Sequence, residues 1–160
     1  MKNSLFLLTF LFTISTFSQK NLPDITLKTI EGKTYKINDT RDENKIIVYA
    51  FWATWCAPCL KELDAINDVY DDWKDEIDVE VIAVSTDDSR TKKRTKPLVN
   101  GKGWEFEVLI DDNQDLKRAL NIVNVPHIVV VKNNKIIHRH SGYTPGAEDE
   151  LFEFIKNYSN

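Results

Sequence analysis

Residues 51–59 read FWATWCAPC and contain both cysteines of this 160-residue chain, Cys56 and Cys59. The preceding run, IIVYAF at residues 46–51, is rich in β-branched and aromatic residues, which is typical of a buried central strand. After the pair, apolar residues recur at helical spacing, as Leu63, Ile66, Tyr70 and Trp73. The pattern therefore places Cys56 where a strand has ended and a helix begins.

Four roles compete for the cysteine pair. A structural disulfide closing a loop of about four residues would contribute only ~2 kcal/mol, against ~4.7 kcal/mol for a hundred-residue loop. A structural zinc site needs about four ligands, and the sequence has no other cysteine. Covalent haem attachment requires a histidine directly after the second cysteine, where this chain has Leu60. The fourth role, a reactive dithiol, is the one that the sequence favours.

The start of a helix is a suitable place for a reactive sulfur. Unpaired N–H groups and the positive end of the helix dipole stabilise a thiolate there. Pro58 fits the first helical turn, where its missing N–H costs nothing. We therefore expect Cys56 to be the attacking sulfur and the more exposed one. Cys59, one turn further on, is expected to be the resolving sulfur.

The first twenty residues differ from the rest of the chain. Lys2 precedes an apolar run centred on Leu5–Phe12, and the small residues Thr16 and Ser18 follow. The run fades after about a dozen residues, short of the ~20 that span a bilayer. This pattern predicts a signal peptide at residues 1–18, a mature domain at residues 19–160, and a periplasmic or secreted location. An uncleaved N-terminal anchor is the alternative.

Composition indicates one globular domain, with 42% hydrophobic and 29% charged residues. The net charge of −4 provides no general basic field for nucleic acid. One basic cluster is present, which we interpret as a solvated helix face, with an anion or partner patch as the alternative. Its members are Arg90, Lys92, Lys93, Arg94 and Lys96.

The remaining pattern predicts an α/β domain with a mixed sheet and helices on both of its faces. For residues 88–104 the sequence predicts a helix broken near Pro97 and Gly101. The other expected elements are a β-hairpin at 23–37, strands at 46–52, 79–87 and 105–110, helices at 57–74, 114–120 and 147–158, and a second hairpin at 127–142 that turns at Asn133-Asn134.

Together these stretches resemble the exported TlpA/ResA-type thiol-disulfide oxidoreductases of bacteria, from about Leu22 to Tyr158. The matching stretches are PDITLKTIEGKTYKI, FWATWCAPCLKE, VIAVSTDD, NVPHIVVV and the closing helix. The resemblance implies a thioredoxin fold with an extra N-terminal β-hairpin. It also implies an enzyme that needs no cofactor, works as a monomer, reduces a disulfide-containing protein and receives electrons from a membrane thiol reductant.

The family also implies roles for single residues. Cys56 and Cys59 would form the redox-active disulfide, and Pro126 would be a cis-proline facing it. Val125, whose backbone would then be free to pair with a substrate strand, would bind substrate together with Trp55 and Pro126.

Glu62 matches an acidic residue that the family places three positions after the second cysteine. On a helix this spacing puts it on the same face as Cys59, where it would donate or accept a proton. A surface glutamate is the alternative.

Three positions depart from related proteins. Ala50 stands where cytosolic thioredoxins carry a buried aspartate. Asp64 replaces a proline of the first helix, so the sequence does not decide whether this helix is kinked. His127 follows the expected cis-proline where threonine is frequent. Its imidazole either stabilises the Cys56 thiolate or points away, and both possibilities stay open.

Two other functions remain alternatives. A peroxiredoxin-like peroxidase carries its threonine three residues before the reactive cysteine, whereas Thr54 is two before Cys56. A non-catalytic copper-handling or binding module separates its cysteines by three residues, not two. Within the favoured function, the substrate could be an apocytochrome or a misoxidised envelope protein. The Ala57-Pro58 pair does not fix the direction of exchange.

Overall fold

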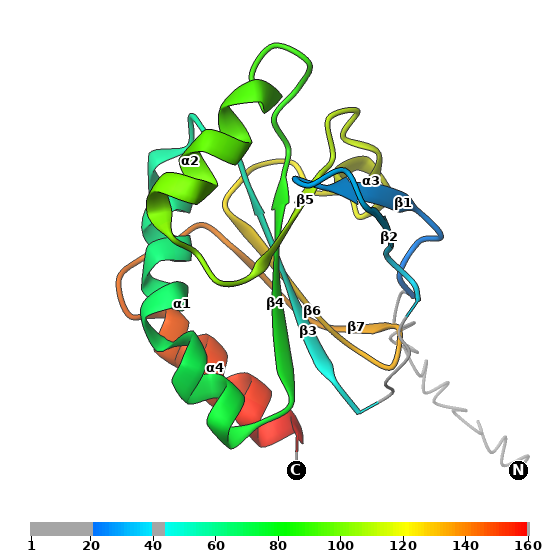
Figure 1. The fold of residues 1–160 in the computed structure, drawn as a ribbon. Helices are drawn as coiled ribbons and strands as arrows, with labels where there is room; N and C mark the ends of the chain where they lie inside the picture. The colour runs from blue at the N-terminus through cyan, green and yellow to red at the C-terminus, as the bar shows by residue number, and fades with distance from the viewer. Residues whose placement is uncertain (1–20, 40–43, 160) are drawn as a thin grey trace, which may run out of the picture.

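The computed structural model describes residues 21–39 and 44–159, so the expected signal peptide lies outside the described residues. Seven strands form one mixed sheet in the order β2-β1-β5-β4-β3-β6-β7 (Figure 1). The strands are β1 (Thr26–Thr29), β2 (Thr34–Lys36), β3 (Ile46–Trp52), β4 (Val79–Ser85), β5 (Glu107–Ile110), β6 (His127–Lys132) and β7 (Lys135–Ser141). The helices are α1 (Ala57–Glu76), η1 (Lys92–Arg94), α2 (Thr95–Lys102), α3 (Asp115–Ala119) and α4 (Ala147–Ser159).

Strand β3 lies inside the sheet, as its composition predicts. It pairs in parallel with β4 on one side and antiparallel with β6 on the other. All seven of its residues are buried because both faces of the sheet are covered. β3, β4 and the start of α1 meet at the upper end of Figure 1.

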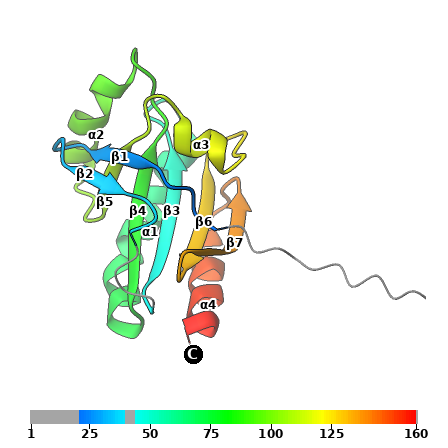
Figure 2. The ribbon, with the colours of Figure 1, turned by 90° about the vertical axis from the view of Figure 1, so that its right-hand side faces the viewer.

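Helices cover the two faces of the sheet unequally. Figure 1 shows α1, α2 and α4 on one side and the short α3 on the other, and Figure 2 shows the strands side by side across the sheet. Alternate residues of a strand point to opposite faces. Val48 and Ala50 of β3 therefore belong to the core beneath α1, whereas Tyr49 and Phe51 belong to the core beneath α3. The expected mixed sheet with helices on both faces is confirmed.

Helix α1 buries the apolar face that the sequence predicts. Leu63, Ile66, Tyr70 and Trp73 are all buried. The sequence left undecided whether the helix bends at Asp64. In the structure Asp64 lies within the single helix Ala57–Glu76. Its carboxylate accepts hydrogen bonds from Trp104 Nε1 at 2.9 Å and Lys102 Nζ at 2.6 Å. Asp64 thus ties α1 to the last residue of α2 and to Trp104 just beyond it.

The predicted break in the helix near Pro97 and Gly101 is wrong. Helix α2 runs through both residues, from Thr95 to Lys102. Pro97 lies in the first turn, where a helix needs no N–H donor, so the proline does not interrupt it. The helix ends instead at Gly103, whose φ of 68° is left-handed and whose N–H donates to Val99 C=O.

The hairpin between β6 and β7 turns where the sequence predicts. Asn133 and Asn134 both have positive φ, 48° and 61°, as a two-residue turn between antiparallel strands requires. Across residues 21–39 and 44–159, no helix has the length and apolar character to span a membrane.

We expect Asp64→Ala to lower the free energy of unfolding by ~1–2 kcal/mol, because Trp104 Nε1 loses its acceptor and Lys102 its ion pair. Asp68→Ala, on an exposed position of the same helix, should change it by less than ~0.5 kcal/mol. Urea unfolding of the two variants measures this difference. Equal effects would show that Asp64 does not tie α1 to its neighbour.

Candidate active site

A disulfide joins Cys56 and Cys59 at the start of α1, with 5.3 Å between their Cα atoms. Cys56 is the N-cap residue, with extended backbone, and Pro58 lies in the first turn. Both cysteines are buried, with 5% of Cys56 and none of Cys59 exposed. The predicted position at a strand-to-helix junction is confirmed, and the exposure follows the expected order by a small margin.

The positive end of the α1 dipole is not neutralised by a side chain of the first turn next to the cysteine pair. No side chain caps the first turn of α1 by hydrogen bonding, and no acidic residue lies in that turn. The free N–H groups and the helix dipole therefore act on Cys56 without a competing carboxylate. This arrangement favours a thiolate at Cys56 once the disulfide is reduced.

A buried aspartate that the sequence analysis did not single out holds the segment before the cysteines. Asp87 is fully buried, and its carboxylate accepts hydrogen bonds from Thr54 N at 2.8 Å and Thr54 Oγ1 at 2.6 Å. Ser85 Oγ donates to the same carboxylate at 2.9 Å. Asp87 thus fixes the backbone two residues before Cys56. In the sequence it follows a buried strand within STDD, which has the polar composition of a surface turn.

The neighbouring Thr86 fixes the end of β3. Its N–H and its hydroxyl both donate to the carbonyl oxygen of Trp52, at 2.8 and 3.0 Å. The chain thus leaves β3 at a carbonyl held by two donors, and reaches Cys56 four residues later. Cys56 N–H donates back to Ala53 C=O at 3.0 Å, which closes the turn.

Glu62 is buried beside the cysteines rather than lying on the surface. Only 3% of it is exposed, and its Oε2 is buried without a hydrogen-bond partner among the described residues. Burial raises the pKa of Glu62 to about 8, and the negative charge of Glu148 contributes in the same direction. The carboxyl can therefore hold or release a proton near neutral pH, one helical turn from Cys59.

The Val125–Pro126 peptide bond is cis, as expected. His127 pairs with Phe51, so this register places the buried Pro126 opposite the end of β3, where the chain turns toward Cys56. Val125 is half-buried and packs against the core that contains both cysteines. Trp55 is 64% exposed directly before Cys56. These three residues and the disulfide lie at one end of the sheet.

His127 lies on a different side of the sheet from the cysteines. It shares its strand face with Val129 and Val131, which belong to the core beneath α3, whereas Cys56 belongs to the core beneath α1. Burial first, and then the charges of Arg139 and His140, lower the pKa of His127. The alternation favours the alternative in which His127 points away from Cys56.

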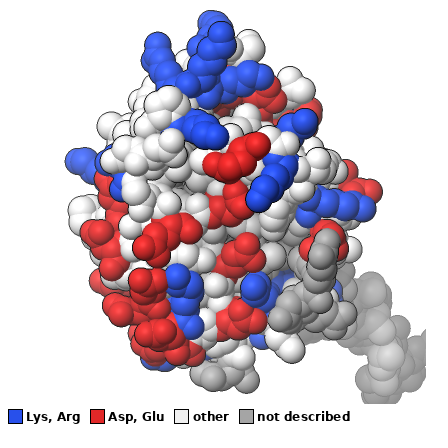
Figure 3. All heavy atoms as spheres, in the orientation of Figure 1, with Lys and Arg blue, Asp and Glu red and all other residues white. Residues whose placement is uncertain are grey.

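The basic cluster surrounds η1 and the start of α2, at the end of the molecule where α1 begins (Figure 3). Arg90 pairs with Asp88 at 2.7 Å, Lys92 pairs with Asp112, and Lys96 lies 3.9 Å from Glu31. Three of the five basic side chains thus form ion pairs with carboxylates, which is consistent with a solvated face.

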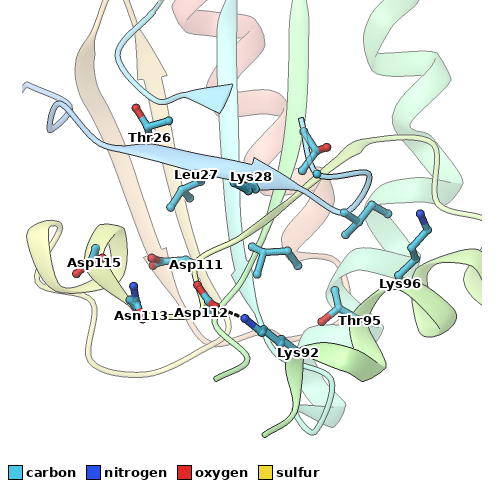
Figure 4. A pocket seen from close by; sticks show the side chains of 14 residues that line it. Thr26, Leu27, Lys28, Lys92, Thr95, Lys96, Asp111, Asp112, Asn113 and Asp115 are labelled. Carbon is cyan, nitrogen blue, oxygen red and sulfur yellow. Dashed lines mark hydrogen bonds and ion pairs between the residues drawn. The ribbon is translucent and has the colours of Figure 1, made fainter. Parts of the chain in front are cut away.

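A cavity of about 470 Å³ lies between β1, α2 and the segment leading into α3 (Figure 4). The ion pair between Lys92 and Asp112 crosses it. Neither cysteine lines this cavity, so the dithiol chemistry lies elsewhere.

The sheet, the disulfide at the start of α1 and the cis-proline directly before β6 define a class, the thioredoxin-fold proteins with a redox-active cysteine pair. The comparisons agree with this class and narrow it. The chain belongs to the AhpC/TSA family, which matches residues 19–140. Within it, the chain is a TlpA/ResA-type protein.

A relative named thiol-disulfide oxidoreductase ResA, from Bacillus thuringiensis (strain Al Hakam), is 31% identical over 138 residues, which cover 86% of this chain and 76% of the relative. The solution structure of an uncharacterized thioredoxin-like protein from Porphyromonas gingivalis is 47% identical, with a TM-score of 0.74, and the match covers 85% of this chain and 90% of that one. A putative thiol:disulfide interchange protein DsbE from Chlorobium tepidum has a TM-score of 0.78 at 22% identity, over 89% of this chain and 97% of that one, and supports the fold alone.

Asp87→Ala should lower the free energy of unfolding by ~2–4 kcal/mol, because Thr54 and Ser85 lose a buried charged acceptor. It should also slow disulfide exchange, since the segment before Cys56 is no longer fixed. Asp88→Ala is the matched control, because Asp88 binds Arg90 and Thr91 locally, and should cost less than ~1 kcal/mol. Unfolding and exchange rates for both variants test this. An Asp87→Ala protein as stable and active as the control would contradict the anchoring role.

Glu62→Gln should make the oxidised protein more stable than the wild type as the pH rises. The unfolded carboxyl releases its proton near 4.5, whereas the folded one keeps it up to about 8. Between these values the folded state binds more protons, so the wild-type free energy of unfolding falls with pH. A glutamine avoids this loss, and its advantage should reach a few kcal/mol above pH 8.

The measurement is urea unfolding of oxidised protein from pH 4 to pH 9, with Glu153→Gln on the exposed side of α4 as the control. A constant difference between Glu62→Gln and wild type across this range would contradict a buried, protonated Glu62.

Proposed function

We propose that this chain reduces disulfide bonds of exported proteins by thiol–disulfide exchange through Cys56 and Cys59. The observation that carries the proposal is the disulfide at the uncapped start of α1, preceded by a segment fixed by Asp87. The relatives named thiol-disulfide oxidoreductases support it.

The reaction proceeds in two exchanges. The Cys56 thiolate attacks one sulfur of the substrate disulfide, forms a mixed disulfide and releases the other substrate sulfur as a thiolate. Cys59 then loses its proton and attacks Cys56. The Cys56–Cys59 disulfide forms, and the second substrate sulfur leaves. Two protons pass from the enzyme's thiols to the two product thiols by way of solvent, and the substrate's disulfide is the oxidant.

Glu62 supplies the base for the second exchange. Cys59 is fully buried, so its thiol has no direct access to solvent for losing a proton. The ionised form of Glu62, on the same helix face, accepts that proton, and with a pKa of about 8 this form becomes more abundant as the pH rises from neutral toward 8. Glu62 would return a proton to Cys59 when a donor reduces the disulfide again.

Trp55, Val125 and Pro126 form the substrate contact. The exposed indole of Trp55 offers apolar area beside Cys56. The backbone of Val125, two residues before β6, accepts an extended substrate segment by strand addition. This recognition through backbone atoms suits many different protein substrates.

The location follows from the predicted signal peptide at residues 1–18. We infer an extracytoplasmic domain that acts as a monomer and is reduced again by a membrane thiol donor. In an oxidising compartment the pair returns to the disulfide unless such a donor supplies electrons.

A peroxidase function is the second candidate, because the family carries the AhpC/TSA name. The hydroxyl of Thr54 argues against it, since this hydroxyl donates to the buried Asp87 at 2.6 Å and is not directed at a substrate of Cys56.

We expect variants of the two cysteines to fail differently when protein that has been reduced and then freed of reductant is mixed with a disulfide-containing protein. Cys56→Ala should abolish reduction. Cys59→Ala should still attack, so that a mixed disulfide accumulates to about one per protein molecule. Non-reducing electrophoresis with mass spectrometry detects the adduct. Accumulation on Cys59 in Cys56→Ala, or peroxide turnover faster than disulfide turnover, would contradict the proposed function.

A further inference from the structure

A second cavity, of about 190 Å³, lies between α1, the strands β6 and β7, and the start of α4. It is smaller than the cavity of Figure 4 and differs from it in reaching the active-site helix through Glu62. Its apolar walls are Ile66, Ile128, Leu151 and Phe154, and its polar lining is Glu62, His138, His140, Glu148 and Glu150.

The lining changes from buried to exposed along the cavity. Glu62 is 3% exposed, Glu148 is half-buried, and His140 and Glu150 are exposed. The cavity therefore leads from the carboxyl of Glu62 to the surface beside the first turn of α4. Its volume holds several water molecules, since one water occupies ~30 Å³ in the liquid.

One oxygen of the Glu62 carboxyl, Oε2, is buried and has no protein partner in the described part of the chain. A buried carboxyl oxygen without a partner is costly, so the carboxyl gains from any movement that brings Oε2 to water in the adjoining polar cavity. Among residues 21–39 and 44–159, no group of three or more His, Cys, Asp or Glu side chains is arranged to hold a metal ion.

The charged groups around Glu62 come from three elements. Helix α4 contributes Glu148 and Glu150, and strand β7 contributes His138 and His140. The pKa of Tyr143, in the loop between β7 and α4, is raised by burial first and then by the negative charges of Glu148 and Glu62. Of these groups, Glu148 is the one whose charge acts on Glu62.

We propose that this cavity is the passage through which Glu62 exchanges its proton with solvent, and that Glu148 is the positioning residue that faces Glu62 along it. The inference rests on the proposed function, in which Glu62 takes the proton of Cys59. In the second exchange the proton moves from Cys59 to Glu62, and from Glu62 through cavity water to bulk solvent. The carboxylate is thereby restored, with no net change in electrons.

The charge of Glu148 is tested by titrating Glu62 directly. In oxidised protein with 13C-labelled glutamate, Glu148→Gln should lower the midpoint of Glu62 by on the order of half a pH unit, as expected for charges interacting across water. Asp149→Asn, which removes the same charge from the same helical turn outside the cavity, should leave the midpoint in place. An unmoved midpoint in Glu148→Gln, or equal shifts in both variants, would overturn the role of Glu148.

The passage is tested by filling it at Ala147, which lines the cavity in the first turn of α4. Ala147→Leu should slow the Cys59-dependent exchange several-fold and leave alkylation of Cys56 in reduced protein unchanged. Ala147→Val, a smaller filling, should give a smaller effect and replaces the leucine variant if that protein does not fold. A Cys59-dependent step at the wild-type rate in a folded filled variant would overturn the passage.

These outcomes are separable from those of the proposed function. The titration of Glu62 uses neither substrate nor free thiols. A wild-type protein that exchanges no disulfides would contradict the proposed function, whereas unchanged titration and unchanged exchange in the variants would contradict the passage alone.

Discussion

The carbonyl of Trp52 is the point on which the rest of the site depends. Two donors from Thr86 hold it, and the neighbouring Asp87 holds Thr54 two residues later. The two residues that follow β4 thus fix the direction in which the chain leaves β3. Because β3 lies between two other strands, its own position cannot adjust. Helix α1 therefore begins at a set place, and Cys56 lies at its start for this reason.

The same burial that fixes the site also sets its acid–base chemistry. The dithiol and Glu62 lie on the inner face of α1, away from bulk water. An ionised carboxyl there is costly, which keeps Glu62 protonated at pH values where a surface glutamate is charged. At high pH the ionised Glu62 lowers the stability of the folded protein. The same burial gives a carboxyl that titrates near neutral pH, one helical turn from Cys59.

Much of this architecture can be predicted from the sequence, because hydrophobic periodicity dictates it. The uninterrupted apolar run of β3, the spacing of Leu63, Ile66 and Tyr70, and the two asparagines before β7 each have a direct physical meaning. The cis peptide at Pro126 and the role of Glu62 came from family resemblance, since neither leaves a mark in local pattern. Asp87 and the cavity beside Glu62 were missed because they depend on residues far apart in sequence. The predicted break at Pro97 was wrong because the sequence pattern placed the start of the helix near residue 88. Helix α2 begins at Thr95, so Pro97 lies in its first turn.

The start of α1 stabilises a thiolate at Cys56, and the chemistry of the pair depends on this effect. The rate of alkylation of reduced Cys59→Ser protein, measured from pH 4 to pH 10, reports the pKa of the Cys56 thiol directly. We expect a midpoint well below the ~8.5 of an ordinary thiol, because the uncapped N–H groups and the helix dipole favour the charged form. A midpoint at or above that value would show that burial outweighs the helix start, and would contradict the assignment of Cys56 as the attacking sulfur.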